Sequence, residues 1–337
     1  LYIIGKSGVG KSFMLNLLTL SDIYQNEGFA VVDPHGDYAQ DIMKFIPENR
    51  IKDVIYVNPD DAMHPVAFNP MESSFSIRQA MDEGKIIIVN LSRGKIGEDN
   101  AAILGSLIIT KIQLDAMSRS DIENIAERKP FYLYVDEFQN FATDSFAVIL
   151  SEARKYGLRL TVANQYVSQM PEEVRDAVFG NVGSMVAFRV GADDAQYLSK
   201  YFEPVFEPLD LVNLDKRNIY VSMSIDGQTS VPFSAQSLNL PTPQFDHTEA
   251  IIEHSRQMYS KNRSEVEDLI ADWSGQNQAP EIQTPQPTNT QQPQASQQNQ
   301  ARPELHGVQP KKYSELIKQN QAGNQPQNKN RRRRRRT

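Results

Sequence analysis

Residues 5–12 constrain this chain more than any other segment, because they match the pattern G-x-x-x-x-G-K-[ST]. The eight residues are Gly5, Lys6, Ser7, Gly8, Val9, Gly10, Lys11 and Ser12. An apolar run, Leu1–Ile4, precedes them and a helix-like segment follows, which is the context that the pattern requires. Backbone N–H groups of such a loop face phosphate oxygens at a helix N-terminus. The segment therefore predicts a strand, a phosphate-binding loop and a helix, against the alternative of a chance glycine-rich turn.

The last two residues of this loop, Lys11 and Ser12, have separate expected roles. Lys11 neutralises charge on the β- and γ-phosphates, and Ser12 ligates Mg²⁺. A second signal, the apolar run Phe131–Val135 followed by Asp136 and Glu137, supplies the carboxylates that Mg²⁺-assisted hydrolysis needs. Asp136 would hold the metal through its water shell, and Glu137 would polarise the attacking water. The acid pair could instead cap a helix, but beside the loop it favours hydrolysis of ATP.

Five further residues are candidates for the same site. Gln165 follows a predicted strand and could sense the γ-phosphate, while Arg154 and Arg189 could each act as an arginine finger from a neighbouring subunit. Asp33 and His35 belong to the run Asp-Pro-His-Gly-Asp directly after another strand, where ligands bind in open α/β sheets. Each also has a plain structural reading as a surface arginine, a loop glutamine or a capped turn.

Continuous apolar runs alternate with amphipathic segments along the first part of the chain. The expected strands are Leu1–Ile4, Phe29–Asp33, Val54–Asn58, Lys85–Leu91, Phe131–Asp136, Arg159–Ala163 and Met185–Val190, and the expected helices include Lys11–Leu20, Asn100–Ala116 and Ser145–Tyr156. Unbroken apolar strands are typical of parallel sheets buried on both faces. The pattern predicts an α/β fold with a mainly parallel sheet flanked by helices, and a hairpin around Asp226-Gly227.

Composition divides the chain into three parts: residues 1–240 as the α/β domain, 241–274 as a helical extension, and 275–337 as a Gln/Asn/Pro-rich tail. Such a tail cannot bury enough apolar area to offset its chain entropy, so we expect it to be disordered. The formal net charge is −7, yet the tail carries about +8, which leaves the body strongly acidic. The tail ends in Arg331, Arg332, Arg333, Arg334, Arg335 and Arg336. Six adjacent arginines favour DNA phosphates, with anionic lipid or a merely solvated tail as alternatives.

Cysteine is absent, so disulfides and thiolate metal sites are excluded. The longest apolar stretch, Ala101–Leu114, is too short to span a bilayer, and no transmembrane helix is expected. Because the chain begins with Leu1 directly in a strand, we expect an upstream segment that could hold membrane helices. The expected location is cytoplasmic, at the inner face of the inner membrane if such helices exist.

Taken together, these motifs resemble the HerA/FtsK-type branch of P-loop ATPases and, more narrowly, the TraG/TraD-like coupling ATPases of conjugation and type IV secretion. The resemblance covers roughly residues 1–240. It rests on the loop of residues 4–12, the runs Val32–Asp37, Val135–Phe141 and Ala153–Leu158, and Ala163-Asn164-Gln165. It implies a RecA-like core that binds ATP and Mg²⁺, with Gln165 as a catalytic glutamine and Arg154 as the inter-subunit finger.

The resemblance further implies a homo-hexameric ring that translocates DNA and meets type IV secretion and relaxosome components. A helical insertion usual in such proteins is missing here, because residues 68–72 lead almost directly into Ile77–Ala80. Two other enzymes stay open, a HerA-like DNA-repair translocase and a pilus-assembly ATPase. A non-hydrolysing nucleic-acid-binding scaffold is the alternative outside enzymes.

Overall fold

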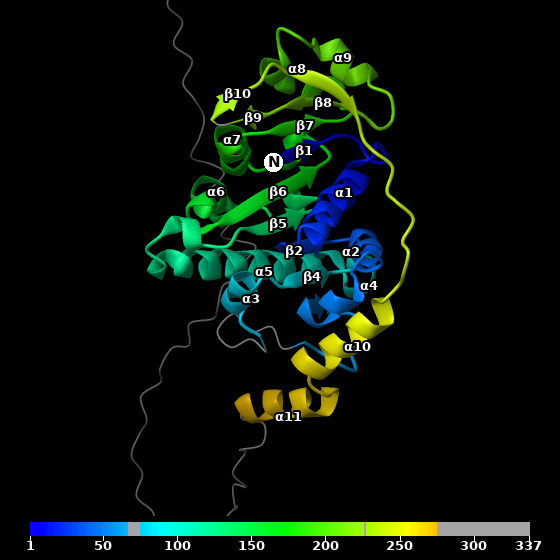
Figure 1. Cartoon of the computed structure of the whole chain (residues 1–337), viewed down its shortest axis with the longest axis vertical. Coiled ribbons are helices and arrows are strands. Elements are labelled where there is room, and N and C mark those ends of the chain that lie inside the picture. Colours follow the sequence, from blue (N-terminus) through cyan, green and yellow to red (C-terminus); the bar gives the residue numbers. More distant parts are fainter. Residues whose placement is uncertain (67–74, 226, 275–337) are drawn as a thin grey trace, which may run out of the picture. The chain divides into compact units, whose positions relative to one another are not determined.

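The computed structural model describes residues 1–66, 75–225 and 227–274 and contains one large, mainly parallel sheet. Its strand order is β11-β8-β7-β1-β6-β5-β2-β4-β3 (Figure 1). The strands are β1 (Tyr2–Ile4), β2 (Gly28–Asp33), β3 (Val54–Val57), β4 (Ile86–Asn90), β5 (Phe131–Val135), β6 (Leu158–Asn164), β7 (Met185–Ala187), β8 (Asn218–Ser222) and β11 (Phe233–Gln236). Strands from β3 to β7 in this order run parallel, which confirms the predicted α/β class.

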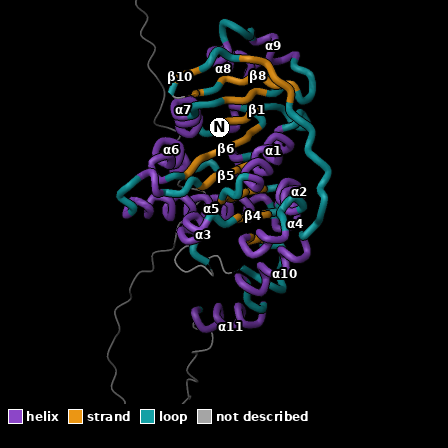
Figure 2. Tube along the Cα trace, viewed as in Figure 1, coloured by secondary structure: helices purple, strands orange, loops and turns teal. Residues whose placement is uncertain are grey.

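Helices cover both faces of this sheet (Figure 2). They are α1 (Lys11–Tyr24), α2 (Asp37–Met43), α3 (Ile77–Glu83), α4 (Arg93–Ile96), α5 (Glu98–Ser118), α6 (Asp144–Glu152), α7 (Glu172–Asn181), α8 (Ala192–Phe202), α9 (Pro208–Asn213), α10 (Thr248–Tyr259) and α11 (Arg263–Trp273). Residues of α1, α2 and α10 pack on one face, and residues of α3, α5, α6, α7 and α8 pack on the other. In Figure 1, α6 and α7 accordingly lie on the opposite side of the sheet from α1 and α2.

The central strands are apolar throughout because successive side chains enter opposite cores. In β2, Ala30 and Val32 belong to the core under α5, whereas Phe29 and Val31 belong to the core under α1. All four are fully buried. A strand that is buried on both faces has no polar side, so it lacks the alternation that marks a half-exposed strand.

The chain reverses direction at one end of the sheet. Strand β8 is antiparallel to β7, and β11 is antiparallel to β8, so the expected hairpin is present. Two short strands, β9 (Ser224–Ile225) and β10 (Gln228–Thr229), pair around the predicted turn. The antiparallel pairing of β8 with β7 brings the segment before β8 next to the phosphate-binding loop, where the Arg217 N–H donates to the Val9 carbonyl at 3.2 Å.

Helix α5 is longer than the apolar stretch Ala101–Leu114, which is by itself too short to span a bilayer. With its continuation to Asp121 it has 24 residues and a mean hydropathy of 1.3, enough by length and composition to cross a membrane. However, Ile108, Ile109 and Ile112 are almost completely buried against the sheet. A core helix of an α/β domain passes the same test, because one of its faces must be apolar to cover the sheet.

The extension after residue 240 is joined to the sheet by α10. Ile251 is fully buried in the core with α1 and α2, and the Ser255 hydroxyl accepts a hydrogen bond from the Tyr56 N–H at 3.1 Å. The segment 68–72, where the helical insertion was expected to be missing, lies outside the described residues. The expected disordered tail from residue 275, with its six terminal arginines, lies outside them as well.

Asp22 on α1 makes stability depend on pH. Its side chain is buried and accepts a hydrogen bond from the Tyr134 hydroxyl at 2.6 Å, and burial raises its pKa from 3.8 to about 6. The folded state therefore binds more protons than the unfolded state between these values, so ionisation of Asp22 costs stability as pH rises through about 6. Asp22→Asn should raise the free energy of unfolding by about 1–3 kcal/mol at pH 8 and hardly change it at pH 4.

Urea unfolding at both pH values tests this expectation, with Asp268→Asn on the exposed face of α11 as the matched control. An equal gain at both pH values would show that the variant acts through packing and not through ionisation.

Candidate active site

The carboxyl ends of β1, β2, β5 and β6 meet at one edge of the sheet and border a cavity of about 660 Å³. Parallel α/β sheets bind ligands at this edge, and the volume suits a nucleotide-sized ligand. The lining residues are Ser7, Gly8, Gly10, Lys11, Ser12, Phe13, His35, Asp37, Asp136, Glu137, Gln165, Lys216 and Arg217. Most residues of the predicted loop and three of the predicted hydrolysis residues therefore share one cavity, although they are far apart in sequence.

The predicted loop connects β1 to the first turn of α1, as expected. The Lys11 ammonium donates hydrogen bonds to the carbonyls of Gly5 at 2.7 Å and Lys6 at 3.1 Å. The side chain is 7% exposed, and burial lowers its pKa while Asp136 and Glu137 oppose that shift. A buried cation at the N-terminus of a helix provides a strong attraction for a polyphosphate.

Ser12 and Asp136 form the part of the site that could hold a divalent metal. The Ser12 hydroxyl donates to one Asp136 carboxylate oxygen at 3.0 Å, and the Glu137 N–H donates to the other at 2.9 Å. Burial, and then the nearby Asp33, raise the pKa of Asp136 to about 6. One carboxylate and one hydroxyl are hard oxygen ligands that Mg²⁺ accepts together with phosphates and water. The donor set therefore fits Mg²⁺.

Glu137 lies among four side-chain donors, three from other segments and one, Asn140, from its own turn. Gln165 Nε2 donates to its carboxylate at 2.6 Å, His35 Nε2 lies 3.0 Å away, and Arg93 Nη1 and Asn140 Nδ2 lie 3.4 Å away. Burial acts to raise the pKa of Glu137, but His35, Gln165 and Arg93 outweigh it, so the pKa falls below its ordinary value. Glu137 also has φ 43°, a conformation in which non-glycine residues are strained and which is common at functional sites. The carboxylate is thus ionised and firmly positioned.

In the motif after β2, Asp33 has a structural role and His35 belongs to the site. The Asp33 carboxylate is buried and accepts backbone N–H bonds from His35 and Ala39, both at 2.9 Å, so it caps the turn and does not line the cavity. His35 points to Glu137 instead. Gly36 has φ 96°, and a Cβ there would lie 2.6 Å from Asn90 Oδ1, so only glycine fits between the two strand ends.

Arg154 and Arg189 do not reach this cavity. Arg154 lies on the short 3₁₀ helix η5 (Ala153–Tyr156) before β6 and lines a separate cavity with Leu1 and Leu158, at the amino ends of the strands. That edge is about 20 Å from the carboxyl edge, the length of β6. Arg189 lies next to the loop, since its carbonyl accepts the Lys6 N–H at 2.9 Å, but its side chain is exposed.

Sequence patterns did not predict a role for Arg93, Lys216 and Arg217. Arg93 follows β4 and touches Glu137, and the other two residues precede β8 and line the cavity. A single arginine in a polar loop has no distinguishing pattern. The order of the strands, which places β4 and β8 near β2 and β1, would have been needed to find them.

Comparisons with known proteins give a family match for one segment of the chain. Residues 130–202, from β5 to the end of α8, match the family described as the TraM recognition site of TraD and TraG. That segment contains Asp136, Glu137, Arg154 and Gln165. Among curated protein sequences, none matches the chain significantly.

Solved structures share the fold at low sequence identity. The plasmid coupling protein TrwB in complex with ADP and Mg²⁺ superposes with a TM-score of 0.57 at 14% identity, over 72% of this chain and 86% of that one. TrwB with a non-hydrolysable GTP analogue gives 0.54 at 15% identity, over 72% and 87%. TrwB with a non-hydrolysable ATP analogue gives 0.53 at 14% identity, over 73% and 86%.

The loop between β1 and α1, the acid pair after β5 and the order of the parallel strands define a P-loop NTPase fold with a RecA-like core. Within that class, the family match and the shared fold confirm the resemblance to the TraG/TraD type of P-loop ATPase.

Proposed function

We propose that this chain is the ATP-hydrolysing motor domain of a conjugative or type IV secretion coupling protein, and that it translocates DNA as a ring of six copies. The observation that carries the proposal is the position of Glu137. An ionised carboxylate, held by Gln165 and His35, faces the same cavity as Lys11 and Ser12. A phosphate-binding site without a hydrolytic role has no need for a positioned base beside the metal ligands.

Different residues of the cavity have different roles in hydrolysis. The loop N–H groups and Lys11 bind and orient the β- and γ-phosphates of ATP. Ser12 and Asp136 would hold Mg²⁺, which offsets phosphate charge when bound. Glu137 polarises the attacking water, while Gln165 and His35 fix the carboxylate in place. Each interaction is preorganised before the reaction, which is how electrostatic catalysis lowers a barrier.

The ring is proposed because the expected finger, Arg154, lies away from the cavity of its own chain, while Arg217, which lines that cavity, lies on the side of the loop opposite to Glu137. Arg154 lies at the opposite edge of the sheet from the nucleotide cavity of the same chain, so it can act only on a neighbour's site. A head-to-tail ring joins the two edges of adjacent copies, because heterologous contacts form a ring when the rotation between copies closes. Arg154 would then stabilise charge that develops on a neighbour's γ-phosphate.

DNA and relaxosome components are the proposed partners. The matched family is described by its recognition of TraM, and the coupling proteins with the same fold are plasmid proteins. The body is acidic, so DNA contact on its outer surface would be repulsive and is proposed for a ring channel and for Arg331–Arg336. The proposed location is the cytoplasm, at the inner face of the inner membrane if the full-length protein has membrane helices.

The test is the ATPase rate of the full chain with and without DNA over a range of salt concentrations. We expect DNA to stimulate ATP hydrolysis. The Lys11→Ala variant should not hydrolyse ATP, either with or without DNA. Replacing all six terminal arginines with glutamine should lower DNA affinity and reduce the slope of log K against log salt by up to about 5. An unchanged slope would show that the arginines do not contact phosphates.

Two outcomes would support another function. Hydrolysis that DNA does not affect would favour a pilus-assembly ATPase. Binding of ATP and DNA without any turnover would favour the nucleic-acid-binding scaffold.

A further inference from the structure

The nucleotide cavity has two chemically different ends, and the strand order separates them. Asp136 and Glu137 follow β5 and Gln165 follows β6, on one side of the loop that follows β1. Lys216 and Arg217 precede β8, on the other side of the loop and beyond β7. The hydrolysis residues fix where the γ-phosphate lies. The nucleoside therefore has to leave the loop toward the β8 side.

The loop before β8 is held in place by both of its neighbours. The Arg217 N–H donates to the Val9 carbonyl of the phosphate-binding loop at 3.2 Å, and the Ser237 N–H donates to the Arg217 carbonyl at 2.9 Å. Arg217 has φ 72°, a left-handed conformation that is unfavourable for a non-glycine residue. Its backbone hydrogen bonds fix this conformation, and they tie the β8 side of the cavity to the loop itself.

The Arg217 side chain places its guanidinium over an aromatic ring. Its guanidinium carbon lies 4.7 Å from the centroid of the Phe13 ring, and Phe13 directly follows Ser12 at the start of α1. Across the described part of the chain, no carboxylate lies within ion-pair distance of Arg217 or Lys216. The wall thus presents two uncompensated cations and one aromatic ring to the cavity.

We propose that Arg217 and Phe13 form the nucleoside-binding end of the site, where the purine base stacks on the guanidinium and phenyl platform. This inference rests on the proposed function and deepens it. Planar cations and aromatic rings bind nucleobases through their π faces. A contact to an additional phosphate would need only a positive charge, which lysine supplies equally well. A guanidinium stacked on a ring also offers a planar surface, which a nucleobase can use and a phosphate does not need.

Binding of ADP and of pyrophosphate, each with Mg²⁺, separates base contacts from phosphate contacts without turnover. Isothermal titration calorimetry on the full chain should show that Arg217→Ala and Phe13→Leu each weaken ADP about tenfold and leave pyrophosphate affinity unchanged. Phe13→Leu keeps an apolar side chain at this position and removes the aromatic ring, so a loss of ADP affinity at unchanged pyrophosphate affinity reports on the ring. Arg217→Lys should lose as much ADP affinity as Arg217→Ala, because it keeps the charge and removes the planar group.

Controls distinguish failure of this inference from failure of the proposed function. Lys11→Ala should weaken both probes, and Arg263→Ala on the exposed α11 should weaken neither. Equal weakening of ADP and pyrophosphate by Arg217→Ala would overturn the platform in favour of a phosphate contact, and so would full ADP affinity in Arg217→Lys. Unchanged ADP affinity in Arg217→Ala would exclude the residue from the site. If the wild-type chain binds neither probe, the proposed function itself fails.

Discussion

Glu137→Gln should lower kcat for ATP hydrolysis about 10²–10⁴-fold and leave Mg²⁺-dependent ATP binding intact. The amide has the same shape as the carboxylate and keeps one oxygen to accept the hydrogen bond from Gln165, which is 2.6 Å in the structure. It cannot polarise water, because it carries no negative charge. Binding should persist because Lys11, Ser12 and Asp136 supply the phosphate and metal contacts.

Single-turnover hydrolysis and equilibrium binding of a slowly hydrolysed ATP analogue measure the two effects separately. Glu173→Gln on the exposed face of α7 is the matched control and should hydrolyse ATP at the wild-type rate. A Glu137→Gln variant that keeps its rate would remove Glu137 from the mechanism. One that loses analogue binding would show that the four donors around the carboxylate need its charge to hold the site together.

Arg119→Met should lower the free energy of unfolding by about 3–5 kcal/mol. Arg119 has 0% exposure, and its guanidinium donates to the carbonyls of Tyr156 at 3.1 Å and Lys129 at 2.8 Å. Its Nε lies 3.0 Å from the Asp82 carboxylate. Methionine fills much of the same volume but leaves both carbonyls without a donor. The lower free energy of unfolding therefore comes from the unpaired carbonyls and not from a cavity.

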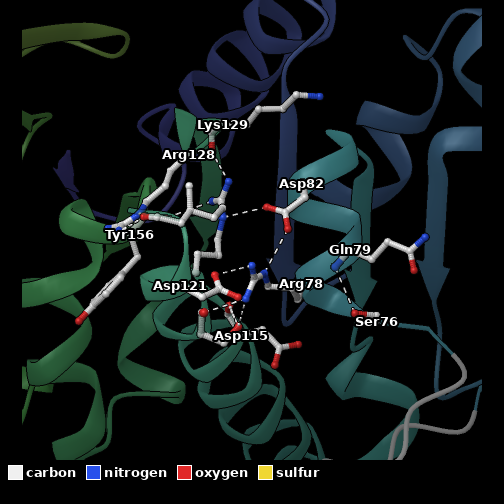
Figure 3. A network of polar contacts seen from close by, with 12 residues as sticks. Ser76, Arg78, Gln79, Asp82, Asp115, Asp121, Arg128, Lys129 and Tyr156 are labelled. Carbon is white, nitrogen blue, oxygen red and sulfur yellow. Dashed lines mark hydrogen bonds and ion pairs between the residues drawn. The ribbon is translucent and has the colours of Figure 1, made fainter. Parts of the chain in front are cut away.

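The surrounding network supplies the control for this stability measurement. Arg78 bonds Asp82 and Asp121 in the same network (Figure 3), but its side chain is 27% exposed. Arg78→Met should cost about 1 kcal/mol or less, because water replaces the lost contacts of an exposed pair. Urea unfolding of the two variants compares them directly. Equal losses would mean that burial of Arg119 does not determine its contribution.

Arg119 also connects stability to the proposed ring. It holds the carbonyl of Tyr156, the last residue of the short helix that carries Arg154. Gly157 follows with φ 76°, a left-handed conformation that favours glycine, and a Cβ there would lie 3.1 Å from the Lys129 carbonyl and 3.3 Å from Arg119 Nη1. The buried arginine thus positions the segment that we propose to face a neighbouring subunit.

Local sequence was sufficient where function depends on adjacent residues. The loop of residues 5–12 creates its phosphate site from its own N–H groups and from the helix it begins, so the pattern alone predicted it. The acid pair after β5 and the parallel α/β class followed from similar local evidence, a continuous apolar strand and the polar residues at its end. His35 and Asp33 were both candidates, and the sequence could not tell that one faces Glu137 while the other caps a turn.

The tertiary structure decided everything that depends on which strands are neighbours. Arg93 reaches Glu137 because β4 lies beside β2, and Arg217 reaches the phosphate-binding loop because the antiparallel β8 lies two strands from β1. Arg154, which is close to Glu137 in sequence, is carried by the crossover to the opposite edge. Parallel strands pair through long connections that leave no local pattern. Sequence therefore determined the chemistry of the loop and its acids, and the strand order determined which distant side chains complete the site.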